Sequence, residues 1–142
     1  MCFLLYIRCS LIKKLTFILI FCILFVTIPA KNDVDSFLSV FKQKMKVYGI
    51  SYHYSDDNSQ TLLDLDISPG ARDKILLKLK SINYYIGPDK DNYDPKSSSV
   101  WEFGIFYNEN EIYIKISLGK KNKPVLCKSF HFPKRTIIYP FK

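Results

Sequence analysis

Residues 100–132, VWEFGIFYNENEIYIKISLGKKNKPVLCKSFHF, decide the fold class of this 142-residue chain. Three runs rich in β-branched and aromatic residues, 100–107, 111–119 and 125–132, are separated by the short polar segments NEN and KKNKP. The middle run alternates apolar and polar side chains, which is typical of a strand with one buried face. Because short polar connections join consecutive antiparallel strands, the stretch predicts a three-stranded meander.

Two helical patterns precede the meander. Residues 32–49, NDVDSFLSVFKQKMKVYG, carry an apolar stripe at helical spacing and end at Gly49, a natural stop. Residues 68–85, SPGARDKILLKLKSINYY, begin with Ser68 as a cap and Pro69 in the first turn. This order of elements predicts an α+β domain in which two N-terminal helices pack on one face of a small antiparallel sheet.

The segments between these elements carry weaker patterns. ISYHYS at 50–55 indicates a short edge strand, and DDNSQ at 56–60 indicates a polar turn. TLLDLDIS at 61–68 fits either a helical turn or a strand. GPDKDNYDPKSSS at 87–99 predicts a loop, because its Gly–Pro pair stops the preceding helix.

Residues 1–30 form an apolar leader with Arg8, Lys13 and Lys14 ahead of an uncharged run from Leu15 to Ala30. Three interpretations fit this leader: a signal peptide, a single membrane anchor, or an extension from a start site assigned too far upstream. A membrane is a partner only if the segment is genuine. The folded domain is expected within residues 31–142 in every case.

Charge and cysteine content indicate which partners and which cellular compartment suit the domain. The chain carries 21 basic and 13 acidic residues; three of the basic and none of the acidic fall in residues 1–30, so residues 31–142 keep a net charge of +5. A basic balance favours anionic partners such as nucleic acid. Cys127 is the single cysteine in residues 31–142 and cannot form an internal disulfide there, which favours the cytoplasm for the domain.

Candidate catalytic residues lie on the three neighbouring strands of the meander. Tyr113 and Lys115 alternate with the apolar residues of the middle strand, His131 ends the third strand, and Glu102 lies in the first. RNA can be cleaved without a metal when its 2′-OH attacks the adjacent phosphate, which needs a base, an acid and cationic groups. Histidine can supply acid or base, Tyr113 a proton, Lys115 a phosphate contact, and Glu102 a base or a positioning group.

The C-terminal third of the chain is basic. From Lys115 onward it holds eight Lys and Arg residues and no acidic one, a composition that attracts polyanions. An ordinary solvated surface with a packing histidine would have the same composition. The RNA-binding residues predicted from it are Lys120, Lys121, Lys123, Lys128, Lys134 and Arg135.

Several blocks, taken in order, resemble the MqsR-type toxins of bacterial type II toxin–antitoxin systems. The blocks are TLLDLDIS, ILLKL, NYYIGPDKD, VWEFG, EIYIKISLG and VLCKSFHFPKRTIIYPFK, and the resemblance covers most of residues 33–142. It implies a RelE-like α+β fold, metal- and cofactor-free cleavage of mRNA, and inhibition by a cognate antitoxin protein.

Within that resemblance, Tyr113 matches the strand tyrosine of the family. Glu102 stands where the best-known members carry glutamine, and His131 where they carry a C-terminal lysine. A family lysine near the end of the preceding helix aligns with Ile86 here, and Lys90 is the nearest basic residue. We therefore expect an endoribonuclease with His131 as general acid.

Two other classes of function remain open from the sequence. A non-catalytic nucleic-acid- or protein-binding module would use the same basic face, with His131 only packing. A membrane-anchored or exported small protein would make residues 1–30 its defining feature.

Overall fold

The computed structural model describes residues 28–91 and 98–142, so the predicted leader lies almost entirely outside the described residues. The helices are α2 (Lys31–Tyr48), α3 (Asp56–Asp64), α4 (Pro69–Leu77) and the short 3-10 helix η1 (Ser81–Asn83). The strands are β1 (Ile50–Tyr52), β2 (Tyr84–Asp89), β3 (Val100–Tyr107), β4 (Asn110–Ser117) and β5 (Val125–His131). Among these residues, no helix combines the length and the apolar character that crossing a bilayer requires.

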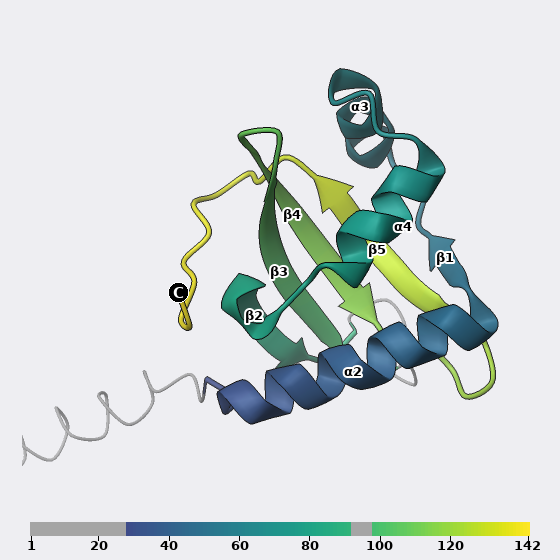
Figure 1. Cartoon of the computed structure of the whole chain (residues 1–142), viewed down its shortest axis with the longest axis vertical. Helices are drawn as coiled ribbons and strands as arrows, with labels where there is room; N and C mark the ends of the chain where they lie inside the picture. The colour runs from purple at the N-terminus through teal and green to yellow at the C-terminus, as the bar shows by residue number, and fades with distance from the viewer. Residues whose placement is uncertain (1–27, 92–97) are drawn as a thin grey trace, which may run out of the picture.

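The fold is α+β, with three helices packed on a five-stranded mixed sheet of order β1-β5-β4-β3-β2 (Figure 1). The predicted meander is confirmed as β3, β4 and β5, which pair antiparallel. The prediction of an antiparallel sheet was wrong at one edge, because β1 pairs parallel to β5. That pairing joins segments more than 70 residues apart, and local sequence patterns do not reveal it.

Two further predictions are corrected by the structure. The DDNSQ segment, predicted to be a turn, opens the third helix α3, and the Ser55 side chain caps it by accepting from the Asn58 backbone N–H. The second predicted helix ends at Leu77, and residues 84–89 form β2 instead of a helix end and a loop. Tyr84 explains the difference, because its ring is buried against Trp101 and Phe103 of β3.

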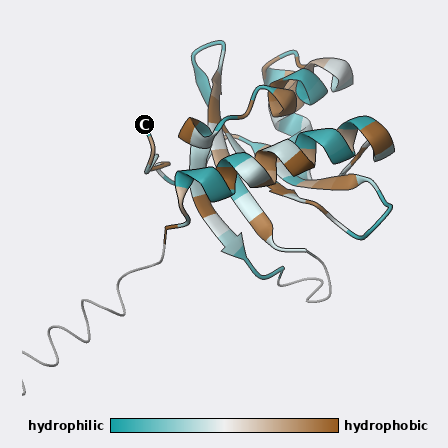
Figure 2. Cartoon of the chain, turned by 60° about the horizontal axis from the view of Figure 1, so that its bottom comes forward, coloured by the Kyte–Doolittle hydropathy of each residue, from teal (hydrophilic) through white to brown (hydrophobic). Residues whose placement is uncertain are grey.

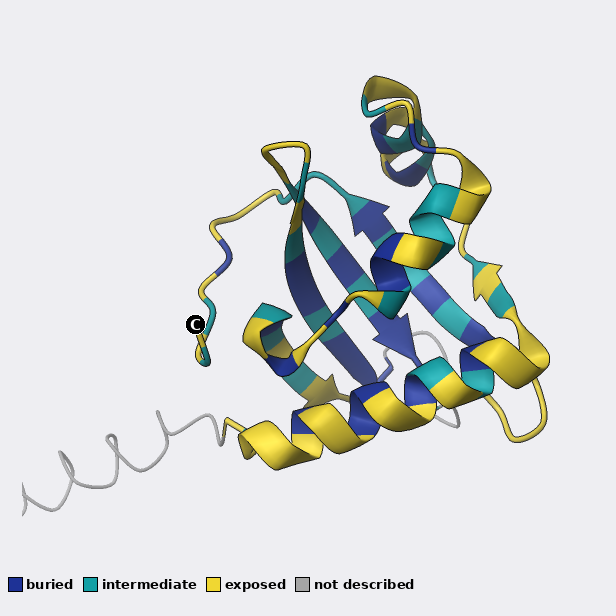
Figure 3. Ribbon diagram, viewed as in Figure 1, coloured by how far each residue is buried: buried dark blue, intermediate teal, exposed yellow. Residues whose placement is uncertain are grey.

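The core lies between the sheet and the two helices α2 and α4, which cover one face (Figures 1 and 3). Hydrophobic residues recur along α2 and the strands (Figure 2), as the predicted stripe requires. The Phe37 ring of α2 stacks on Trp101 of β3 with centroids 4.5 Å apart. The three isoleucines of β4 are fully buried beneath the helices: Ile112, Ile114 and Ile116. We call the opposite face of the sheet the open face.

Candidate active site

A bulge in β5 decides which face of the sheet carries His131. In a regular strand the side chains alternate, so Cys127 and His131 would point to the same face. The pairing of β5 with β4 shifts between Cys127 and Ser129, so that Lys128 is an extra residue on the β5 side. The shift reverses the alternation: Cys127 is buried in the core, whereas His131 pairs with Tyr113 on the open face.

The side chain of Asn58, from α3, holds the backbone of this bulge. Its Nδ2 donates to the carbonyl of Lys128 (3.4 Å) and to that of His53 (2.9 Å), and its Oδ1 accepts from the Phe130 N–H (2.9 Å). Asn58 is buried, 5% exposed. A bulge leaves backbone groups without ladder partners, and buried backbone groups need partners. Asn58 therefore supplies the bonds that the distorted ladder lacks.

The four predicted catalytic residues lie together on the open face. Two neighbouring rows of paired residues cross β3, β4 and β5: Gly104, Tyr113 and His131 in one, and Glu102, Lys115 and Ser129 in the next. The ring centroids of Tyr113 and His131 are 5.2 Å apart. In the next row, Lys115 Nζ lies 3.0 Å from Glu102 Oε1.

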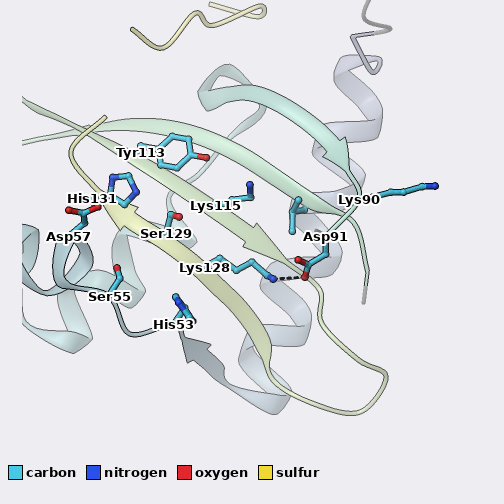
Figure 4. Close-up of a pocket in the computed structure, with 11 residues that line it drawn as sticks. His53, Ser55, Asp57, Lys90, Asp91, Tyr113, Lys115, Lys128, Ser129 and His131 are labelled. Carbon is cyan, nitrogen blue, oxygen red and sulfur yellow. Dashed lines mark hydrogen bonds and ion pairs between the residues drawn. The ribbon is translucent and has the colours of Figure 1, made fainter. Parts of the chain in front are cut away.

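Two cavities meet at Tyr113 and His131, which line both of them. The first cavity, of about 600 Å³, extends toward β1 and α3 (Figure 4). Polar side chains dominate its lining: His53, Ser55, Asp57, Lys115, Lys128 and Ser129. The second cavity, of about 410 Å³, lies between β2, β3 and the C-terminal segment, and is lined by Tyr85, Ile86, Glu102, Pro133, Arg135 and Ile137 among others.

Tyr113 is held as a hydrogen-bond donor. Burial raises the pKa of its phenol, and so does its hydrogen bond to the Glu102 carboxylate. Lys115 pairs with the same carboxylate, which is largely buried at 13% side-chain exposure. The hydroxyl therefore keeps its proton at neutral pH, and the Glu102 carboxyl group lies between the Tyr113 hydroxyl and the Lys115 ammonium group.

The hydrogen bond of His131 fixes the tautomer of its neutral ring. Nδ1 lies 2.8 Å from the backbone carbonyl of Phe132. A carbonyl oxygen only accepts, so Nδ1 carries the proton in the neutral ring and donates it. Nε2 is then the nitrogen that can take up and give back a proton. The imidazole is therefore oriented for acid or base chemistry next to the phenol of Tyr113.

Three of the six predicted RNA-binding residues line the cavities. Lys128 lines the first and forms an ion pair with Asp91. Lys134 and Arg135 line the second, and Lys134 also binds Asp57, whose pKa it lowers through a hydrogen bond and its charge.

The other three predicted RNA-binding residues lie elsewhere. Lys120, Lys121 and Lys123 occupy the loop between β4 and β5 and line neither cavity. Lys44 of α2 donates to the backbone carbonyls of Leu118 and Lys120, which holds this loop against the helix. The structure thus separates this basic loop from the candidate active site.

Some lining residues were not predicted from the sequence. No chemistry was predicted for His53, which follows β1 and donates its backbone N–H to the Cys127 carbonyl. The parallel pairing of β1 with β5 brings it to the rim of the first cavity, with Ser55 and Asp57 (Figure 4). Lys90 also lines this cavity, whereas Ile86 lines the second and lies on a strand rather than near a helix end.

The C-terminal segment forms a wall of the second cavity by crossing the open face at Gly104. A Cβ on Gly104 would lie 2.4 Å from the Tyr139 hydroxyl and 2.7 Å from Ile137 Cδ1. The Tyr139 hydroxyl donates to Glu111 at 2.5 Å, which anchors the segment to β4. Gly104 pairs with Tyr113, so the wall stands directly beside the candidate catalytic tyrosine.

Within residues 28–91 and 98–142, no group of three or more His, Cys, Asp or Glu side chains is arranged to hold a metal ion. Comparison of the chain with protein families, with curated proteins and with solved structures finds no match. The site is therefore interpreted from its own geometry.

Proposed function

We propose that the chain is a metal-independent endoribonuclease that cleaves mRNA, and that it acts as the toxin of a type II toxin–antitoxin system. The observation that carries the proposal is the pairing of Tyr113 with His131 on the open face, with ring centroids 5.2 Å apart and a cavity on each side. Tyr113 as a hydrogen-bond donor, His131 as a proton-transfer group and the Lys115–Glu102 pair thereby lie around one place on the open face. Cleavage of RNA by attack of its 2′-OH requires groups of these kinds.

In the proposed reaction the scissile phosphate lies where the two cavities meet. Glu102 accepts the proton of the 2′-OH as this oxygen attacks phosphorus. The bond to the 5′-oxygen breaks, and His131 Nε2 gives that oxygen a proton, leaving a 2′,3′-cyclic phosphate and a 5′-OH. Tyr113 and Lys115 donate hydrogen bonds to the phosphoryl oxygens, whose negative charge increases during the attack.

The toxin assignment rests on the resemblance to MqsR-type proteins. The order of sequence blocks, the basic C-terminal third and the α+β arrangement are compatible with a RelE-like fold and with a cognate antitoxin as partner. Co-expression with the product of a neighbouring small reading frame tests this partner. The proposal expects a stable complex in which RNA cleavage by the full chain is inhibited.

Cleavage of RNA in EDTA by the full chain and its variants tests the catalytic assignment. The His131→Ala variant should lower the single-turnover rate about 10²–10⁴-fold, the usual contribution of general acid–base catalysis. The matched control is Lys46→Ala, an exposed residue on α2 beyond the core. Equal cleavage by wild type and His131→Ala would contradict the assignment, and RNA binding without cleavage would favour a non-catalytic module.

A further inference from the structure

The second cavity differs in character from the first. The residues of its lining that the first cavity does not share include an aromatic ring and three apolar side chains: Tyr85, Ile86, Pro133 and Ile137. The residues that only the first cavity has are mostly polar: three lysines, two serines and two aspartates, with His53 and the single apolar residue Val100. A polar and charged surface, like that of the first cavity, binds phosphates and sugars. A base instead needs a flat apolar surface on which to stack, and the second cavity offers such a surface.

Tyr85 does not pack in the core, so its side chain is available to contact a ligand. Its neighbour Tyr84 is 3% exposed and packs on the rings of the core, whereas Tyr85 is half-buried and lies outside the core cluster. Tyr85 lines the second cavity together with Tyr113 and His131. An aromatic side chain next to the reacting centre is thus available for stacking.

Other groups of the second cavity add to a base-binding surface. Arg135 and Lys134 bring positive charge, and a guanidinium plane can stack on a base as well as pair with a phosphate. Asp89 can accept hydrogen bonds from the N–H groups of a base edge. Pro133 and Ile137 belong to the C-terminal wall, so this surface depends on how that segment crosses Gly104.

We propose that the second cavity binds the nucleobase on one side of the scissile phosphate, stacked on Tyr85, while the first cavity binds the ribose and phosphate on the other side. The substrate is then single-stranded RNA, because a paired base cannot enter such a cavity. A volume of about 410 Å³ is within the range of small-ligand sites. This inference rests on the proposed cleavage site at Tyr113 and His131.

Binding of short uncleavable RNA to the full chain tests the inference. The probes are the sixteen dinucleoside monophosphates with a 2′-O-methyl group on the first ribose, which prevents attack, and binding is followed by NMR titration. Stacking on an aromatic side chain is lost in Tyr85→Ala, which should weaken binding by about 5- to 100-fold. Tyr85→Phe should bind within about two-fold of wild type, because the ring is retained.

A cycle with abasic probes identifies the base that stacks. Removing the base at one of the two positions should weaken binding to wild type as much as Tyr85→Ala does, and should cause no further loss in that variant. Removing the other base should weaken both proteins equally. Tyr48→Ala, an exposed tyrosine of α2, is the matched control and should leave every affinity unchanged.

Three results would overturn the inference: unchanged affinity of Tyr85→Ala, losses that add for both abasic positions, or no shift at the second cavity with any probe at millimolar concentration. Cleavage of unmodified RNA is measured separately. Cleavage that does not depend on Tyr85 would refute the proposed base-binding site but not the proposed nuclease activity. If the abasic probes show coupling to Tyr85 but unmodified RNA is not cleaved, the nuclease activity is refuted and the base-binding site is retained.

Discussion

Tyr113 shows how the open face controls the chemistry of a single residue. Burial and the Glu102 hydrogen bond raise the pKa of its phenol above the ordinary value of about 10. The hydroxyl therefore stays protonated well into the alkaline range and can only donate to a phosphoryl oxygen. This role separates Tyr113 from His131, whose Nε2 is the proposed proton-transfer atom because its Nδ1 faces the Phe132 carbonyl.

Replacing Tyr113 by phenylalanine tests the role of that hydroxyl. The variant keeps the ring on β4 but loses the donor, so the single-turnover cleavage rate should fall about 10²–10³-fold, the usual loss for one such donor. Affinity for uncleavable 2′-O-methyl RNA should change by less than about three-fold, because the donor acts on charge that develops during the reaction. Tyr48→Phe is the control, and a wild-type rate in Tyr113→Phe would refute the role.

The sequence predicted the placement of some site residues and not of others. Alternation in the middle strand was enough to put Tyr113 and Lys115 opposite the buried isoleucines. The same rule, applied to VLCKSFH, places His131 on the face of Cys127, which is buried in the core. Only the bulge at Lys128 corrects this, and it depends on tertiary contacts that no local pattern contains.

Among the elements, helix α3 was not predicted from the sequence, although the candidate active site depends on it. Its inward residues, Asn58 and Thr61, are polar, so no apolar stripe marks a helix. Both bind the backbone at the end of β5, since Thr61 Oγ1 accepts from the Phe132 N–H (3.3 Å) and Asn58 bridges the bulge. A segment resembling a polar turn therefore supports the backbone that carries His131, the proposed catalytic histidine.

Asn58→Ala tests this support. The Phe130 N–H and the Lys128 and His53 carbonyls would lose their bonds, which should lower the free energy of unfolding by about 1–3 kcal/mol. Hydrogen exchange at the Phe130 amide should accelerate more than exchange in β3. Gln60→Ala, an exposed position on the same helix, should change the stability by less than about 0.5 kcal/mol. Equal urea midpoints for the two variants would show that Asn58 does not hold the bulge.

Gly104→Ala tests how the C-terminal segment contacts β3. The new Cβ would overlap Tyr139 Oη and Ile137 Cδ1, so the segment must move. We expect a loss of about 1–3 kcal/mol, as in other overpacked positions, and faster proteolysis after Lys134 and Arg135. In a chain truncated after Pro133 the same substitution should have no further effect on stability. An equal loss with and without the segment would place the strain elsewhere.

At the scale of the whole molecule, the two faces of the sheet carry different kinds of side chain. Its helix-covered face holds the aromatic and aliphatic core, and its open face holds the ionisable groups that line the two cavities. The α+β class and the central three strands could be predicted, because their signals are local. The parallel edge strand β1 and the irregular strand β2 could not, because their pairing is set by packing.

Burial of ionisable groups also predicts a sharp alkaline limit to stability. Burial raises the pKa of the Cys127 thiol and that of the Tyr84 phenol to about 12 each, and raises those of Tyr52 and Tyr139 as well. These groups ionise more readily in the unfolded chain, so stability is full below about pH 8.5 and falls as pH rises toward the folded values.

Urea unfolding between pH 7 and pH 11.5 checks this limit. The midpoint should be constant up to about pH 8.5 and then decline, first because the unfolded thiol ionises and then because the phenols do. In Cys127→Ala the decline should begin only near pH 10, whatever the cost of the substitution at neutral pH. A midpoint that stays level to pH 11.5 would be incompatible with these buried groups.

The most direct test of the cleavage site is the mass of the RNA fragments. The full chain is incubated in EDTA with a short RNA, and with the same RNA carrying 2′-O-methyl groups throughout. The account predicts upstream fragments ending in a 2′,3′-cyclic phosphate, downstream fragments starting with 5′-OH, and no cleavage of the methylated RNA. Fragments with a 5′-phosphate, or cleavage of the methylated RNA, would contradict it.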